Sequence, residues 1–131
     1  MNKLPIVKAT FYIAGDEFDI DDVTTRMKII PTKEMKKSDF PACGLPHTEW
    51  VFKIEEEHAD CIENTFNKIM AVLIGKEKMI SQICTDYNAE VGIVITIYMK
   101  KNKRPLLDLS REMISFAASI NAEIGFDLYI D

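Results

Sequence analysis

The chain has 131 residues, 47% hydrophobic and 28% charged, which fits a single domain over residues 1–131 with one buried core. Its net charge of −5, with scattered basic residues, argues against nucleic acid as a partner, because phosphate binding requires clustered positive charge. No run approaches the roughly 18 apolar residues of a membrane span, and three widely spaced cysteines suggest neither a disulfide framework nor a structural zinc site, which together indicate a cytoplasmic protein.

Apolar and polar residues alternate over residues 6–14, as is typical of a half-buried strand. Asp19 follows as the predicted N-cap of a short helix, with Asp21 and Asp22 in the first turn, where the helix dipole favours negative charge. Pro31 limits that helix, because the residue before a proline is disfavoured in the helical conformation.

Residues 31–46 predict a long loop, since they hold three prolines, one glycine and three lysines among scattered apolar residues. Loops longer than about 12–15 residues are uncommon in compact domains and are usually functional or mobile, and the sequence leaves both interpretations open. The loop leads to residues 47–54, where apolar and polar residues alternate again and predict a second strand.

Two helices are expected next. Residues 55–57 are three glutamates that open the first helix at its positive end, apolar residues recur at helical spacing as far as Leu73, and Gly75 ends the run. The second helix is expected over residues 76–87. Cys84 lies on its apolar stripe, which indicates a packing role rather than a nucleophile.

The stretch Glu90–Met99 is the clearest strand in the chain. One face carries bulky apolar side chains, namely Val91, Ile93, Ile95, Ile97 and Met99. The lighter face carries Gly92, Val94, Thr96 and Tyr98. Each bulky apolar side chain contributes roughly 1.5–3 kcal/mol when fully buried, so we expect this strand at the centre of a sheet, with helices over its aliphatic face.

The last part of the chain predicts a turn, a helix and a strand. The basic segment 100–105 is interpreted as a solvated turn rather than a phosphate site. Ser110 predicts the N-cap of the helix, and Asn121 its end, because asparagine tolerates a left-handed backbone. Residues 124–130 alternate as a strand, with one face formed by Ile124, Phe126, Leu128 and Ile130.

The expected order is strand, helix, strand, two helices, strand, helix, strand. Every strand has an aliphatic face and a mixed face, so alignment of the aliphatic faces places the helices on one side. The sequence therefore predicts an α+β fold, a two-layer sandwich in which one mixed sheet of about four or five strands has helices packed on one face.

The mixed face of the sheet is the candidate binding surface. Tyrosine offers a large ring and a polar tip at low entropic cost and is frequent in contact surfaces. The alternative is a solvated sheet face stiffened by cross-strand pairs, and the sequence does not decide between the two. The candidate binding residues are Tyr12, Thr96, Tyr98, Asp127 and Tyr129, with His47 and Trp50 at the end of the loop.

No catalytic arrangement stands out in the sequence. His47 and His58 lack partners at ligand spacing, and Cys43 with His47 is the one thiol–imidazole pair worth naming. The acidic residues within 16–22 lack the glycine and terminal glutamate of a calcium loop, and helix capping explains them. We therefore expect no catalytic residue, no metal site and no cofactor.

Three stretches of the chain carry a family resemblance. They are a glycine with an acidic helix start and a Pro-Thr pair (15–24 and 29–32), a Thr-Glu-Trp (48–50), and a closing helix with an Asp-x-Tyr strand (109–112 and 121–129). In this order they resemble the bacterial family named domain of unknown function 4279, although the family more often has glycine in place of Glu49 and Asn121. The resemblance implies a small cytosolic bacterial α+β domain without an established activity.

The leading hypothesis is a protein-interaction domain without enzymatic activity, which uses the mixed face and the 31–46 loop to bind a protein partner or a second copy of itself. One form is an immunity-type protein that neutralises a toxin. The alternative is a small-molecule-binding protein, or an enzyme, with its site between the mixed face and that loop. A concave pocket of at least about 300 Å³ lined by polar groups would favour the alternative.

Overall fold

The computed structural model describes residues 5–36, 47–56 and 59–131. In these ranges the elements are β1 (Ile6–Gly15), α1 (Ile20–Met27), β2 (Lys33–Met35), β3 (Thr48–Glu56), α2 (Ile62–Leu73), α3 (Glu77–Tyr87), β4 (Glu90–Met99), α4 (Arg111–Ser119) and β5 (Glu123–Ile130). The strands form one mixed sheet in the order β2-β3-β1-β4-β5, in which only the β4–β5 pair is parallel. The predicted α+β class with a single mixed sheet is confirmed.

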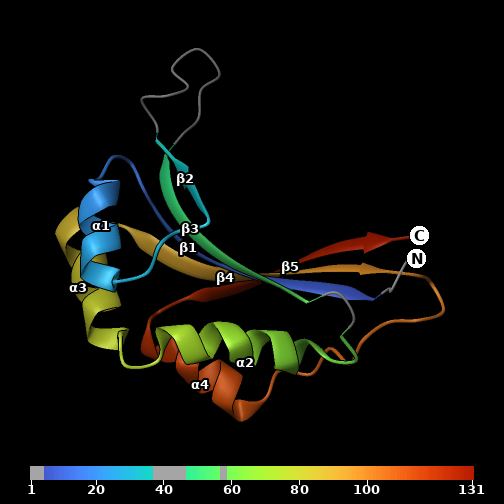
Figure 1. Cartoon of the computed structure of the whole chain (residues 1–131). Helices are drawn as coiled ribbons and strands as arrows, with labels where there is room; N and C mark the ends of the chain where they lie inside the picture. Colours follow the sequence, from blue (N-terminus) through green and yellow to red (C-terminus); the bar gives the residue numbers. More distant parts are fainter. Residues whose placement is uncertain (1–4, 37–46, 57–58) are drawn as a thin grey trace.

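The helices lie on one side of a strongly twisted sheet (Figure 1). α2 and α4 run beneath the strands, and α1 and α3 pack against each other at one end. The aliphatic faces of β1 and β4 point into this helical layer, where Phe11, Ile93 and Ile97 are fully buried. None of the helices in the described ranges has the length and apolar character needed to span a membrane.

Local capping chemistry sets three element ends as predicted. The Asp19 carboxylate accepts a hydrogen bond from the Asp22 N–H at 3.1 Å and caps α1. The Ser110 hydroxyl accepts one from the Met113 N–H at 3.2 Å and caps α4. Asn121 follows α4 with a φ of 56°, the left-handed conformation expected of a residue that ends a helix.

The predicted helix start at residues 55–57 is wrong, because β3 extends to Glu56 and α2 begins only at Ile62. β1 pairs antiparallel with β3 along its whole length, and the last pair of that ladder is Val7 with Glu56. The ladder's backbone hydrogen bonds outweigh the preference of glutamates for a helix N-terminus. The helix start is then held by non-local bonds, since the Ile62 N–H donates to the Leu106 carbonyl at 3.0 Å.

The predicted 31–46 loop contains a short strand, β2. Lys33 and Met35 pair antiparallel with Val51 and Glu49 of β3, and the Thr32 hydroxyl donates to the Val51 carbonyl at 3.2 Å. Edge pairing of three residues leaves almost no trace in hydrophobic periodicity, which explains why the sequence did not reveal it. Residues 37–46 lie outside the described part of the chain.

From Phe126 onward the aliphatic face of β5 is exposed, contrary to the expected burial, while Ile124 packs against the core. Phe126, Leu128 and Ile130 are 44%, 47% and 55% exposed. They continue a buried row of β4, because the register places them beside Ile95, Ile97 and Met99. α2 packs mainly on β1 and β3, so the apolar row continues past the helical layer.

Candidate binding surface

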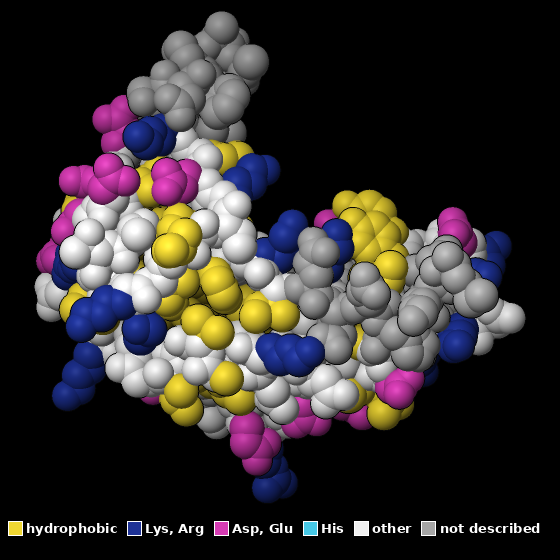
Figure 2. All heavy atoms as spheres, in the orientation of Figure 1, with side chains coloured by type: hydrophobic (Ala, Val, Ile, Leu, Met, Phe, Trp, Pro, Cys, Tyr) yellow, Lys and Arg dark blue, Asp and Glu magenta, His cyan; other side chains and the backbone are white. Residues whose placement is uncertain are grey.

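The face of the sheet that points away from the helices is called the open face. It is formed by Lys8, Thr10 and Tyr12 of β1, Glu49, Val51 and Lys53 of β3, Gly92, Val94, Thr96 and Tyr98 of β4, and Gly125, Asp127 and Tyr129 of β5. Seen from one side, the outline of the molecule is hollowed between the arm that carries β2 and the opposite end of the sheet (Figure 2).

A stacked pair of tyrosines lies at one end of the open face. The rings of Tyr98 and Tyr129 are 4.8 Å apart at 15°, and the Lys8 ammonium lies 5.0 Å from the centre of the Tyr98 ring. The Tyr129 hydroxyl donates to the Asp127 carboxylate at 3.0 Å, and this bond is the main cause that raises the pKa of Tyr129. With Tyr129 49% exposed, this end offers a preformed aromatic surface to solvent.

Tyr12 lies at the other end, across the backbone of β4. A Cβ at Gly92 would overlap the hydroxyl end of the Tyr12 ring, so glycine at this position allows the ring to lie flat over the strand. Gly92 and Tyr98 are six positions apart on β4, roughly 20 Å at a strand rise of about 3.3 Å per residue. The three predicted tyrosines therefore lie on one face of the sheet but form two separate groups, Tyr98 with Tyr129 and Tyr12 alone.

The charges of three carboxylates from three strands act on the Tyr12 hydroxyl. Glu49 on β3 and Glu90 on β4 are each two positions from the cross-strand partners of Tyr12, and Glu123 on β5 is the neighbour of Gly92. Burial raises the pKa of Tyr12, and the negative charges of Glu123, Glu90 and Glu49 raise it further.

An open hollow of about 730 Å³ lies over Tyr12. Its polar lining includes Thr10, His47, Glu49 and Asn88, and the His47 Nε2 is 3.4 Å from a Glu49 carboxylate oxygen. Within the described residues, no group of three or more histidine, cysteine or acidic side chains is arranged to hold a metal ion. The site therefore offers negative charge, an aromatic floor and hydrogen-bonding groups.

A protein-family model described as Domain of unknown function (DUF4279) matches residues 5–131, which is nearly the whole chain. The chain belongs to this family. Searches of curated proteins and of solved structures gave no match. The family resemblance expected from the sequence is thus confirmed. In this DUF4279 domain, Asp127 and Tyr129 of the Asp-x-Tyr element lie on the open face.

The structure divides the predicted binding residues of this DUF4279 domain. Thr96 is partly buried on the open face, between Lys8 of β1 and Asp127 of β5, and His47 borders the hollow. The prediction of Trp50 as a binding residue is wrong, because its side chain is fully buried on the helix-covered side and is not available for direct contact. Cys43 and His58, considered for catalysis, lie outside the described residues.

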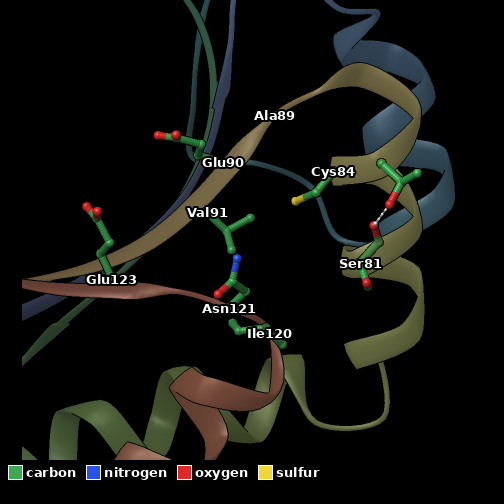
Figure 3. Close-up of a pocket in the computed structure, with 9 residues that line it drawn as sticks. Ser81, Cys84, Ala89, Glu90, Val91, Ile120, Asn121 and Glu123 are labelled. Carbon is green, nitrogen blue, oxygen red and sulfur yellow. Dashed lines mark hydrogen bonds between the residues drawn. The ribbon is translucent and has the colours of Figure 1, made fainter.

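A second cavity of about 360 Å³ lies between α3, the start of β4 and the turn before β5. Figure 3 shows the Cys84 sulfur pointing into it from α3, while the carboxylates of Glu90 and Glu123 point away from α3. Burial raises the pKa of the Cys84 thiol, which disfavours the thiolate needed of a nucleophile. The thiol packs beside the core, as predicted.

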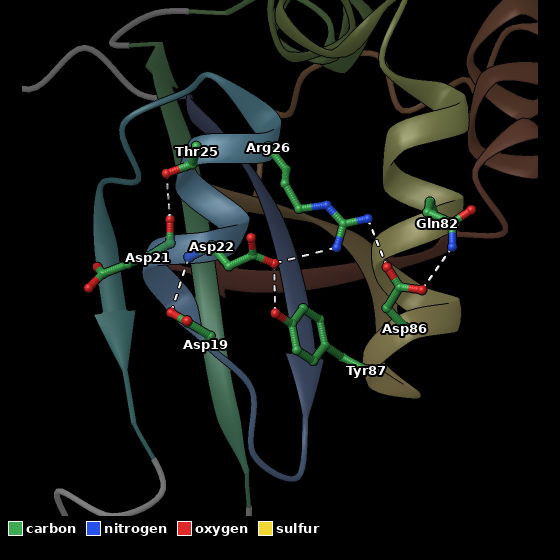
Figure 4. Close-up of polar contacts among 8 residues, drawn as sticks. All are labelled: Asp19, Asp21, Asp22, Thr25, Arg26, Gln82, Asp86 and Tyr87. Carbon is green, nitrogen blue, oxygen red and sulfur yellow. Dashed lines mark hydrogen bonds and ion pairs between the residues drawn. The ribbon is translucent and has the colours of Figure 1, made fainter.

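A polar network that the sequence did not reveal joins α1 to α3 (Figure 4). Arg26 contacts Asp22 at 3.4 Å on its own helix and Asp86 at 2.9 Å on α3. The Tyr87 hydroxyl donates to Asp22 at 2.6 Å, so the fourth tyrosine serves helix packing. The spacing of Asp22 and Arg26 is visible in the sequence as an i,i+4 pair, but the cross-helix contacts require the fold.

Replacing Asp86 with asparagine is expected to cause a small decrease in Tm at pH 7 that disappears in acid. Hydrogen bonds from Gln82 and then Arg26 lower the pKa of Asp86 in the folded protein. A carboxyl with a lowered folded pKa contributes stability above its unfolded pKa, about 3.9, and loses it as the pH falls through the folded value. Thermal unfolding of both proteins from pH 7 to 3 tests this, with Asp108→Asn as an exposed control. A difference in Tm that does not shrink between pH 7 and pH 3 would contradict it.

Proposed function

We propose that this domain acts by binding rather than by catalysis, and that its open face receives a positively charged segment of a partner protein in the hollow over Tyr12. The supporting observation is that Tyr12, Glu49 and Glu90 line this hollow together, with Glu123 beside Gly92 on the neighbouring strand. A lysine or arginine side chain entering this hollow would meet the carboxylates of Glu49 and Glu90 and the ring of Tyr12, with Glu123 adding negative charge from the next strand.

The stacked tyrosines supply the second half of the proposed contact. Tyr98 and Tyr129 are ordered before any partner arrives, because they stack on each other and Asp127 holds the Tyr129 hydroxyl. Preordered aromatic side chains lose little entropy on binding and often dominate interface energies. An immunity-type role, with a toxin that bears a basic segment as the partner, is one form of this function.

A small-molecule site in the same hollow is the second candidate. The volume of about 730 Å³ falls within the range of ligand pockets, about 300–1,000 Å³, and Thr10, His47 and Asn88 offer hydrogen bonds. We favour the protein partner because the hollow is continuous with an open sheet face, whereas small-ligand sites usually enclose most of the ligand surface.

An amidated tetra-arginine peptide is a direct probe of the proposed function. In an NMR titration we expect chemical-shift changes at Tyr12, Glu90 and Gly92, and we expect high salt to abolish them because exposed charges are screened. Changing Glu49, Glu90 and Glu123 together to glutamine should weaken peptide binding by about threefold to a hundredfold, since each exposed charge pair contributes about 0.2–1 kcal/mol.

A matched control carries the same change in net charge at other sites, Asp21→Asn, Asp108→Asn and Glu112→Gln. It should leave peptide binding within about twofold of the wild type, because screening confines the effect of these charges to about 10 Å. Equal weakening by both triple variants would show a non-specific charge effect and reject the proposal. Shifts caused by small polar ligands but not by the peptide would support the small-molecule site instead.

A further inference from the structure

β5 is an edge strand of the sheet, and one of its faces carries an exposed row of apolar side chains. β5 is the last strand at one side of the described sheet, and Phe126, Leu128 and Ile130 point to the helical side without being covered. Exposed apolar edge strands readily pair with other strands, and natural proteins usually protect them with charges, bulges or prolines. Between Ile124 and Ile130, the apolar face of β5 carries neither a charged residue nor a proline.

The backbone of β5 presents its free hydrogen-bonding groups at the same residues. The Asp131 N–H donates to the Met99 carbonyl at 2.9 Å, and the Asp131 carbonyl accepts from the Lys101 N–H at 3.3 Å, so this residue faces β4. Backbone groups alternate in direction along a strand, which turns those of Phe126, Leu128 and Ile130 toward the open edge. A strand added there would pair with residues whose side chains are also exposed.

The sequence of β5 is complementary to itself in one antiparallel register. When two copies pair with Leu128 opposite Leu128, Phe126 lies opposite Ile130 on one face and Asp127 lies opposite Tyr129 on the other. The register centred on Asp127 sets two carboxylates against each other, which is destabilising. The register centred on Phe126 places the exposed Ile130 opposite the half-buried Ala122, so only the Leu128 register matches the three exposed apolar residues with one another.

We propose that two copies of this chain associate through β5 in the register centred on Leu128, so that the two five-stranded sheets continue as one. The two-fold axis of such an antiparallel pair is perpendicular to the sheet, which places both open faces on the same side. A second copy is the occupant that this edge fits, because hydrogen-bonding groups, apolar side chains and the Asp–Tyr pairs all match in a single register. The interface uses the outer edge of β5 and does not depend on the function proposed above.

Light scattering and sedimentation velocity on the whole chain test this proposal. The wild type should show twice the chain mass of 15.0 kDa, with a concentration-dependent return to the monomer on dilution. Leu128→Lys sets two like charges opposite each other and should give only the monomer. Leu128→Pro removes an N–H from the pairing edge and should do the same. The control is Ile114→Lys, an equally exposed apolar position on α4, which should leave the dimer intact.

Cysteine cross-linking tests the register and remains informative if the Leu128→Lys and Leu128→Pro variants fail to fold. Opposed Cα atoms in a hydrogen-bonded antiparallel pair are about 5.5 Å apart, within the disulfide range of about 4.4–6.8 Å, so oxidised Leu128→Cys should form a covalent dimer. Phe126→Cys should not, and the wild type controls for the native cysteines. A wild type that stays monomeric at every concentration, a dimer that survives Leu128→Lys, or cross-linking of Phe126→Cys alone would each overturn the proposal.

Discussion

Replacing Trp50 with alanine is expected to lower the free energy of unfolding by about 3–5 kcal/mol. The indole is fully buried under β3, its ring meets that of Phe11 edge to face at 6.2 Å, and its Nε1 donates to the Thr24 hydroxyl at 3.0 Å. β3 is held between β1 and β2, so its backbone cannot move inward to fill the space that alanine would leave.

Two further variants separate the causes of this loss. Trp50→Phe keeps most of the buried volume but leaves the Thr24 hydroxyl without its donor, and we expect a loss of about 1–3 kcal/mol. Tyr129→Ala removes an aromatic ring that is 49% exposed, and we expect a loss within about 1 kcal/mol. Urea unfolding followed by circular dichroism measures all three. A Trp50→Ala loss below about 1 kcal/mol would contradict the buried position and restore Trp50 as a candidate contact residue.

Trp50 also shows how far the sequence could define the candidate site. Alternation places its side chain on the aliphatic side of β3, but its position after the long loop suggested a contact role, and aromatic residues serve cores and interfaces equally well. The carboxylates around Tyr12 were missed for a different reason. Glu49, Glu90 and Glu123 are distant in the sequence, and only the order β3-β1-β4-β5 brings them to one hydroxyl.

The fold itself was predictable where short-range chemistry determines it. The alternation of Glu90–Met99 and the capping by Asp19 and Ser110 depend on neighbouring residues, and all three were predicted correctly. β2 and the extension of β3 to Glu56 depend on a partner strand, which no local pattern encodes. The exposed row on β5 is a non-local property too, because coverage depends on where the helices end.

Gly92→Ala is expected to lower the free energy of unfolding by about 1–3 kcal/mol, as over-packing usually does, and to weaken binding of the arginine peptide. The new methyl group would overlap the outer end of the Tyr12 ring and force the ring off β4. Gly125→Ala is the matched control, since it is another strand glycine on the open face, and its Cβ would meet only a Val94 methyl group at 4.0 Å. We expect that control to change stability by less than about 0.5 kcal/mol.

A double-mutant cycle with Tyr12→Ala identifies the cause. If the overlap with the ring accounts for the loss, Gly92→Ala should cost nothing once the ring is absent, giving a coupling energy of about 1–3 kcal/mol. Tyr12→Phe should not relieve the loss, because the ring carbons next to the hydroxyl would overlap the methyl group as well. If Gly92→Ala destabilises the Tyr12→Ala protein to the same extent, the glycine serves the backbone rather than the ring. The position of the Tyr12 ring over β4 would then not depend on Gly92.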